Sequence, residues 1–332
     1  MDTPQPETTP AASVLAVVLV DFMKAHRGWG WMRLVAGPSA YKAVPGLQSA
    51  KVMGSGHEGG FTLRPSATHQ GLLCRFDAAD AAMDFLHGEQ VQAYRERARE
   101  CWGGLLAITS ARGQWDQQSW GLSDAPSQQL SPQWQARLQQ HWRAAEAAQT
   151  TGTGDAGCAV APSSLASPVA RAARAAQAAR EARTALGADT ASAAAEPVHL
   201  PHAHSGGELA GGAQPPVGVL TRASIQPSKT TAFWRHAPAT QASLDAAPGC
   251  LLAMGLGEAP LLRQCTFSLW QDEPSMLHYA REGAHQQASA AAYKHRFFSE
   301  SLFVRLRVLH MAGRWKAQEF GNGLGWGEVA HA

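Results

Sequence analysis

Apolar and polar residues follow two patterns along the chain. Residues 15–22 are almost continuously apolar, as in a fully buried strand, whereas apolar and polar residues alternate in RQCTFSLW (263–270) and LFVRLRVL (302–309). Alternation with a period of two predicts a strand with only one face in a core. Further apolar runs predict strands at 71–76, 105–110 and 217–225.

The predicted elements occur twice in the same order. In each half a strand leads to a Trp-containing helical segment and a Pro-Gly break. A strand ending at Met-Gly-x-Gly, a return strand, a helix opened by acids or Pro, and a last strand follow. This order, β-α-β-β-α-β, is that of the ferredoxin-like unit. We therefore predict an α+β fold in which two ferredoxin-like repeats pack face to face as a pseudo-dimeric α+β barrel.

Matching residues support an internal duplication. The Met-Gly-x-Gly sequence occurs at 53–56 and again at 254–257, and an offset near two hundred holds for the other matches as well. A constant offset is the signature of a repeat. The other matched pairs are Trp31 with Trp234, 45–46 with 248–249, 94–97 with 293–296, and 113–115 with 313–315.

A segment of different composition separates the two halves. Residues 122–213 are rich in Ala, Gln, Ser and Gly and poor in bulky apolar residues, so they cannot bury enough surface to offset the entropy of ordering. We expect a linker that is largely disordered or partly helical. The predicted organisation is a disordered N-terminus (1–12), a first repeat (13–121), this linker, a second repeat (214–322) and a C-terminal tail (323–332).

Charge and cysteine content restrict the possible partners and the cellular compartment of the protein. The 332 residues carry a net charge of +2, which argues against nucleic acid as a partner. The five cysteines include no Cys-x-x-Cys pair, which favours a reducing compartment. The apolar run at 11–22 is too short to span a bilayer, and no basic residue precedes it as in a signal peptide. We therefore expect a cytoplasmic protein.

The Gly-rich stretch GSGHEGG (54–60) invites comparison with a phosphate-binding loop. However, no Gly-Lys-Ser/Thr follows, and the turn joins two predicted strands, so the helix N-terminus that would hold a phosphate is missing. We predict instead a hairpin turn whose glycines supply positive φ.

His285 lies where the two repeats differ in length. From Met to Tyr, the second repeat (276–293) is about six residues longer than the first (83–94). Depending on the direction of counting, the first-half counterpart of His285 is Gln92 or Leu86, the latter next to His87. A neutral imidazole is a good ligand for haem iron. A lone helical histidine is more often a surface or capping residue, and both interpretations stay open on chemistry alone.

The tryptophans and several longer motifs give further information on the core and on the family. The tryptophans at repeat-matched or strand-end positions are expected to pack in the core, although a flat apolar ligand would also use them; they are Trp31, Trp115, Trp234, Trp270 and Trp315. The runs VLTRASIQPSKTTAFWRHAP, GLGEAPLLRQCTFSLW and GRW in the second half resemble the spheroidene monooxygenases of purple bacterial carotenoid synthesis. KVMGSGHEGGFTLRP in the first half resembles the same family, and the resemblance covers all but the first ten residues and the linker.

This resemblance implies a reaction and a set of partners. Spheroidene, an acyclic methoxy carotenoid, would be hydroxylated twice at C2 and so become the ketone spheroidenone, with O₂ and with electrons from reduced ferredoxin. Haem, of b type, is the implied cofactor. Because the substrate dissolves in membranes, we also expect peripheral contact with the photosynthetic membrane, although the sequence shows no evident amphipathic anchor.

The resemblance also suggests site residues. His285 is the candidate axial ligand of the iron, and Arg281 is placed to meet a haem propionate. Arg263 and Gln264, with Trp234 and Trp270, are candidate substrate-pocket residues. Two other classes remain open, because ferredoxin-like barrels also include cofactor-free monooxygenases and haem lyases or dehydratases, and because a carrier of haem or carotenoid could share the barrel.

Overall fold

The computed structural model describes residues 14–120, 128–151, 215–259 and 261–321, which all belong to one compact unit. Most of the predicted linker and both predicted tails lie outside the described residues. The described first part of the linker contains the helix α4 (Pro132–Thr151). Its Trp134 is 5% exposed and donates from Nε1 to Asp84 Oδ1 (3.2 Å), so the beginning of α4 packs on the first half.

The first half contains four strands. Three α-helices and three short 3-10 helices lie between these strands. The elements are β1 (Val14–Phe22), η1 (Lys24–His26), α1 (Arg27–Ala36), η2 (Gly37–Tyr41), β2 (Leu47–Gly56), η3 (His57–Gly59), β3 (Pro65–Phe76), α2 (Ala79–His87), α3 (Glu89–Arg95) and β4 (Ala98–Gly113).

The second half repeats this order and adds a short final strand. Its elements are β5 (Val217–Ile225), η5 (Pro227–Lys229), α6 (Thr230–Trp234), α7 (Ala237–Asp245), β6 (Cys250–Ala259), β7 (Arg263–Trp270), α8 (Glu273–Arg281), α9 (Gly283–Lys294), β8 (Phe298–Trp315) and β9 (Gln318–Phe320).

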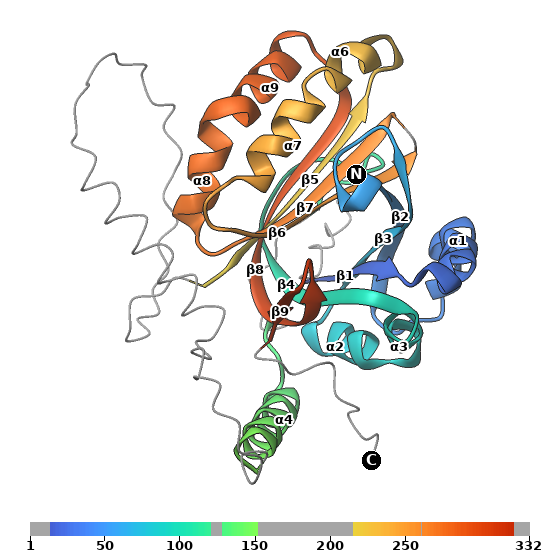
Figure 1. Cartoon of the computed structure of the whole chain (residues 1–332), viewed down its shortest axis with the longest axis vertical. Helices are drawn as coiled ribbons and strands as arrows, with labels where there is room; N and C mark the ends of the chain where they lie inside the picture. The colour runs from blue at the N-terminus through green and yellow to red at the C-terminus, as the bar shows by residue number, and fades with distance from the viewer. Residues whose placement is uncertain (1–13, 121–127, 152–214, 260, 322–332) are drawn as a thin grey trace, which may run out of the picture. The chain divides into compact units, whose positions relative to one another are not determined.

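The strands form one closed antiparallel barrel (Figure 1). Their order is β4-β1-β3-β2-β6-β7-β5-β8, and β8 pairs back onto β4, so that eight strands close the sheet while β9 extends it as a hairpin. Each half therefore contributes four adjacent strands. The predicted α+β class and the barrel are confirmed.

The β4–β8 seam joins the halves through corresponding residues. Gly113 pairs with Leu302, and Trp102 pairs with Gly313. Both glycines have positive φ, +95° and +104°. A Cβ on Gly113 would lie 2.0 Å from the carbonyl oxygen of Ser301, and one on Gly313 would lie 2.2 Å from that of Cys101. Only glycine fits at either position, because both the backbone conformation and the space exclude a side chain.

The hairpin predicted in GSGHEGG is present, but its turn occupies only 57–60, and of the glycines in this stretch only Gly59 has a positive φ, +77°. The Met-Gly-x-Gly sequences themselves belong to the strands β2 and β6. The second seam pairs Gly54 with Gly257. Strand register also makes Gly54 the counterpart of Gly257, two residues beyond the predicted match with Gly255. A shift of two keeps every side chain on its own face, so the hydrophobic pattern could not reveal it.

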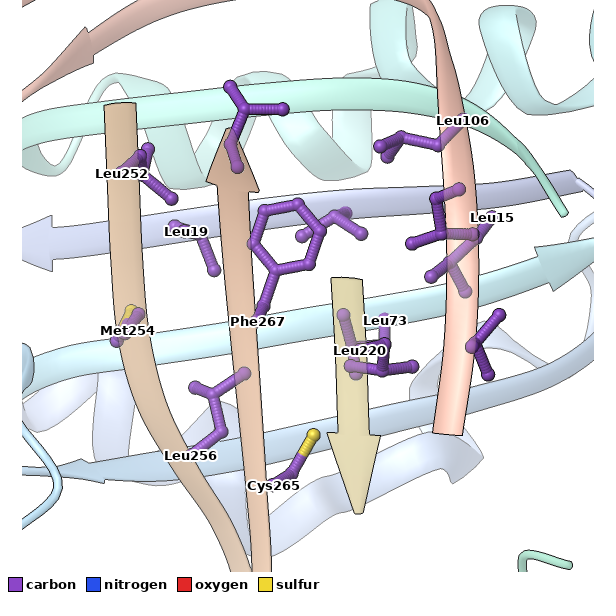
Figure 2. Close-up of a cluster of buried hydrophobic side chains, with 14 of the residues drawn as sticks. Leu15, Leu19, Leu73, Leu106, Leu220, Leu252, Met254, Leu256, Cys265 and Phe267 are labelled. Atoms are coloured by element: carbon purple, nitrogen blue, oxygen red, sulfur yellow. The ribbon is translucent and has the colours of Figure 1, made fainter. Parts of the chain in front are cut away.

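The interior of the barrel is filled with apolar side chains. Figure 2 shows Leu15, Leu19 and Leu73 of the first half meeting Met254 and Phe267 of the second. All five are at most 2% exposed. An eight-stranded barrel is just wide enough for such side chains to fill it. The barrel interior is therefore a core that joins the halves, and a ligand site has to lie elsewhere.

Helices cover the outer faces of the sheet. In the first half, α2, α3 and the start of α4 pack on β1, β3 and β4, and in the second half α6–α9 lie over β5–β7 (Figure 1). Among the described residues, no helix has the length and apolar character needed to cross a bilayer.

Candidate functional site

The outer face of the second half's sheet is incompletely covered. Thr221, in the middle of β5, pairs with Thr266 of β7 on one side and with Phe303 of β8 on the other. Thr221 is exposed, and its two partners are half-buried. At the corresponding positions of the first half, Val18 and Leu72 are at most 1% exposed. We call Thr221, Thr266 and Phe303 the open sheet face.

The helices above this face explain why it is open. Apart from Ala292, no residue of α9 is buried, and α7 buries only Ala237 and Leu244. The cluster between helices and sheet accordingly contains four buried residues, against nineteen in the first half. Small side chains on the helices and threonines on the strands bury fewer apolar groups here than the helices and strands of the first half do.

Two aromatic rings connect His285 with the end of β7. Trp270 ends β7, is 1% exposed, and donates from Nε1 to Ser268 Oγ (3.0 Å). The ring of Tyr279 lies 5.1 Å from that of Trp270 and 4.7 Å from the His285 imidazole. The three rings form a continuous aromatic row from the sheet to α9.

The protonation of His285 suits a metal ligand. Burial lowers the pKa of His285, so the imidazole is neutral at physiological pH. Its Nδ1 lies 3.4 Å from the carbonyl oxygen of Ala280. A proton on Nδ1 can be donated to this oxygen, which leaves the lone pair on Nε2. A neutral imidazole oriented through its other nitrogen is the usual form of a histidine ligand.

The break between α8 and α9 sets the position of His285. The N-terminus of α8 is capped by Asp272, whose Oδ1 accepts from the Ser275 amide (2.8 Å). The helix ends at Arg281, and Gly283, with a φ of +64°, begins α9 in a new direction. Arg281 is exposed at this break. A cation there, four residues before His285, can meet an anionic group of a ligand at the protein surface.

A second aromatic contact includes a residue of the first half. Trp234 is 9% exposed and donates from Nε1 to the Leu261 carbonyl (3.1 Å). The ring of Phe61 stacks on it at 5.0 Å, and the Phe61 amide donates to Gln241 Oε1 (2.5 Å). Gly255 permits this approach, because a Cβ there would lie 2.9 Å from the Phe61 backbone.

Gln264 and Arg263 lie on opposite faces of β7. Cys265 and Phe267 point into the barrel core, so Gln264 faces outward toward the helices, on the side of the open sheet face. Arg263 is directed to the end of the barrel instead, where it pairs with Asp116 (3.6 Å) and is half exposed. The structure thus gathers His285, Trp270, Gln264 and Trp234 on one layer and places Arg263 elsewhere.

The barrel end near Arg263 is a paired charge cluster. Arg222, 1% exposed, pairs with Glu300 and lies 3.6 Å from Glu258. Lys51 pairs with Glu258 (2.9 Å) and with Asp116; although desolvation opposes it, these partners raise the pKa of Lys51. The adjacent pocket, lined by Lys51 among others, has a volume of about 120 Å³. It is too small for a haem or a carotenoid.

The donor set fits a haem better than a metal cluster. Within the described ranges, no group of three His, Cys, Asp or Glu side chains could hold a metal ion. Burial raises the pKa of Cys101 to about 12 and that of Cys250 to about 11, which favours the thiol over the thiolate. A haem needs a single protein ligand and a flat apolar surface; His285 can supply the ligand, and the neighbouring rings of Tyr279 and Trp270 can supply apolar contact.

The sequence prediction missed Thr221, Tyr279 and Phe61. One signal was present: β5 reads VGVLTRASI, whereas β1 reads VLAVVLVDF, so a threonine interrupts the apolar run in one copy only. Phe61 could not be found from the sequence, because its contact with Trp234 joins residues of different halves.

Comparison with known proteins gives the family. The chain is 36% identical over 321 residues, 96% of its length and 91% of the relative's, to the spheroidene monooxygenase of Rubrivivax gelatinosus. It is 37% identical over 105 residues, 31% of this chain and 44% of the relative, to that of Rhodobacter capsulatus. The spheroidene monooxygenase of Cereibacter sphaeroides is 33% identical over 106 residues, 31% of this chain and 33% of the relative.

Similarities to solved structures are more distant, and no protein-family profile matches the chain. Aldoxime dehydratase aligns with 92% of this chain and 83% of its own at 10% identity and a TM-score of 0.46. A cofactor-independent oxygenase from Streptomyces nogalater aligns with 32% of this chain and 96% of its own at 15% identity and a TM-score of 0.23. These values do not bear on function. The identity of 36% over nearly the whole chain does, and the protein belongs to the spheroidene monooxygenase family.

Proposed function

We propose that the protein oxidises spheroidene and related acyclic methoxy carotenoids at C2 to the 2-ketone. Membership of the family supports the substrate class, and the open sheet face supports the place of the reaction. The single structural observation that carries the proposal is the exposure of Thr221 beneath a helix layer, where Val18 of the first half is buried.

The reaction balances as two hydroxylations followed by a dehydration. Each hydroxylation consumes one O₂, two electrons and two protons, inserts one oxygen atom into a C–H bond at C2, and releases one water. The second product is a geminal diol, which loses water to become the ketone. Reduced ferredoxin, a one-electron donor, is the proposed source of the electrons.

We infer that a b-type haem lies against the open sheet face, with His285 as the protein ligand of its iron. When bound, the haem supplies the activation of O₂. His285 holds the iron through a neutral imidazole whose other nitrogen is directed to Ala280. Arg281 supplies a positive charge for a propionate at the exposed break between α8 and α9.

The remaining residues would hold the substrate. The half-buried Phe61 ring, which stacks on the buried Trp234, offers aromatic contact at the end of the layer away from His285. Such a ring suits a polyene, whose recognition depends on apolar contact. The half-buried Gln264 amide offers a polar contact for the methoxy end of the carotenoid.

We also infer that the two halves are copies of a ferredoxin-like unit. In each half the order of elements is strand, helix, strand, strand, helix, strand, and the fourth strand lies beside the first while the second lies at the other edge. This arrangement is that of the ferredoxin-like fold. In a duplication, one copy can specialise while the other keeps the original packing.

Absorption spectroscopy and turnover test the proposal together. The full chain, reconstituted with haem, should show a Soret band and convert spheroidene to the ketone with O₂ and reduced ferredoxin. Conversion without haem would favour a cofactor-free monooxygenase. A Soret band or carotenoid binding without any conversion would favour a carrier. The first result would overturn the haem assignment, and the second would overturn the proposed reaction.

A further inference from the structure

The helix α1 exposes an apolar stripe to solvent. Trp31, Met32 and Val35 are 51%, 64% and 82% exposed. Positions i, i+1 and i+4 lie on one face of a helix, and with Gly28 they make one stripe along α1. Among the described residues, no other helix exposes more than one bulky apolar side chain. A contiguous apolar surface of this kind marks a contact site.

The opposite face of α1 is fixed to the sheet, so the stripe cannot turn inward. The ring of Trp29 meets that of Tyr94 edge to face at 5.0 Å. A Cβ on Gly30 would lie 2.7 Å from the Phe22 ring, so the helix lies directly on β1 there. The Arg33 guanidinium lies 5.2 Å from the centroid of the Tyr41 ring. Figure 1 shows α1 at the periphery of the first half.

The segment that contains the stripe carries charge of one sign. From Phe22 to His57 the sequence contains no Asp or Glu and five Lys or Arg. Lys24 and Arg27 are exposed at the N-terminal end of α1, and Lys42 is exposed beyond its C-terminal end. An apolar stripe with Trp, flanked by cations at both ends, has the character of a helix that lies in a membrane interface.

We propose that α1 docks on an anionic lipid surface through Trp31, Met32 and Val35, with Lys24, Arg27 and Lys42 held at the headgroups. The exposed cations Lys24, Arg27 and Lys42 favour an anionic lipid surface over a second copy of the chain, because the same cations on two copies repel each other. Such a surface would let the protein take up a carotenoid dissolved in the membrane. This purpose rests on the proposed function, whereas the membrane contact itself does not.

Vesicle flotation of the full chain tests this surface. The protein should bind vesicles of phosphatidylcholine mixed with phosphatidylglycerol more tightly than vesicles of phosphatidylcholine alone, and added salt should weaken the difference. The triple variant Trp31→Ser, Met32→Ser, Val35→Ser should lose at least about tenfold in affinity for the mixed vesicles. The variant Lys24→Gln, Arg27→Gln, Lys42→Gln should lose about fivefold per charge removed on the same vesicles.

Matched controls separate this effect from general surface change. Tyr293→Ser removes an aromatic side chain that is 85% exposed on α9, and Lys294→Gln removes a neighbouring exposed cation. Both variants should bind mixed vesicles as the unaltered protein does. All substituted residues are exposed, so thermal unfolding should not change and should exclude misfolding as a cause.

Three results would overturn the assignment. The unaltered protein could fail to bind either kind of vesicle, or the stripe variant could bind as tightly as the unaltered protein. Light scattering could also show a dimer that the stripe substitutions convert to a monomer while vesicle binding persists, which would make the stripe an interface between copies. None of these measurements depends on haem or on turnover, so their failure is distinguishable from failure of the proposed reaction.

Discussion

The two helix layers of the molecule differ far more than the two sheets beneath them. In the first half, the strands and helices α2 and α3 enclose a dense apolar core that buries Val18 and Leu72. In the second half, the corresponding Thr221 and Thr266 are left partly in water under small-residue helices. A well-packed layer stabilises a fold, whereas an incompletely packed one has room for a ligand. The difference shows that the first half has the denser apolar layer, and on the proposed function the less densely packed second half holds the ligand.

Of the substitutions that test the difference between the halves, removal of His285 is expected to have the largest effect on haem binding and activity. His285→Ala should lower haem affinity and spheroidene conversion by at least about 100-fold, because no second ligand replaces the imidazole. The first-half alternative, His87, packs at 5.1 Å on Trp134, so His87→Ala should keep the Soret band. If His87→Ala loses the band and His285→Ala keeps it, the haem ligand lies in the first half and not in the second.

The seam glycines should show where the halves are equivalent. Gly113→Ala and Gly313→Ala each place a Cβ against a carbonyl oxygen of the other half and force a residue with a side chain into positive φ. Each should lower the free energy of unfolding by about 2–4 kcal/mol in chemical denaturation. Gly28→Ala is the control, since nothing lies within 4 Å of a Cβ there and its φ is not positive. A large inequality between the two seam variants would show that the barrel is not symmetric at this seam.

Acid should lower the stability of the filled layer, by which we mean the apolar core between the sheet and the helices of the first half, through protonation of His310. Residue His310 pairs with Leu105, which belongs to that layer, and burial lowers the pKa of His310 to about 4. The unfolded value is about 6.5, so the stability contributed by the neutral ring is present above that pH. It is lost as the pH falls through the folded value, by up to about 3 kcal/mol.

The variant His310→Leu should therefore flatten the decline in stability between about pH 6.5 and pH 4, measured by denaturant unfolding at each pH. His278→Leu, which alters a half-exposed histidine paired with Glu282, should leave the decline unchanged. An unchanged slope in His310→Leu would remove this residue as the cause.

Substitution of the central strand residues Val18 and Thr221 should have the smallest effect, and this effect is on the free energy of unfolding. Val18→Thr buries a hydroxyl in the filled layer and should cost about 1–3 kcal/mol of unfolding free energy. Thr221→Val in haem-free protein should change stability by less than about 0.5 kcal/mol, because the position is exposed. Equal costs would mean that both layers are packed alike in solution, and the comparison between them would fail.

Sequence patterns predicted the elements well and the site partly. The length difference between the repeats directed the prediction to His285, whereas Arg263 and Gln264 were predicted as pocket residues without regard to the face of their strand. The structure places Arg263 on the face of the buried Cys265 and Phe267, opposite to Gln264. The site roles of His285, Arg281, Trp234, Trp270, Arg263 and Gln264 stay predictions.

The amino-acid sequence by itself determined the α+β class, the repeated order of strands and helices and the strand faces, because these depend on local periodicity and on matches at a constant offset. Only the tertiary structure decided the register of the repeats, since a shift of two residues preserves every face. It alone decided that Phe61 reaches Trp234 across the halves, and that Thr221 lies uncovered while Val18 is buried. Whether a residue is covered depends on side chains brought to it from distant elements, and no local pattern contains that information.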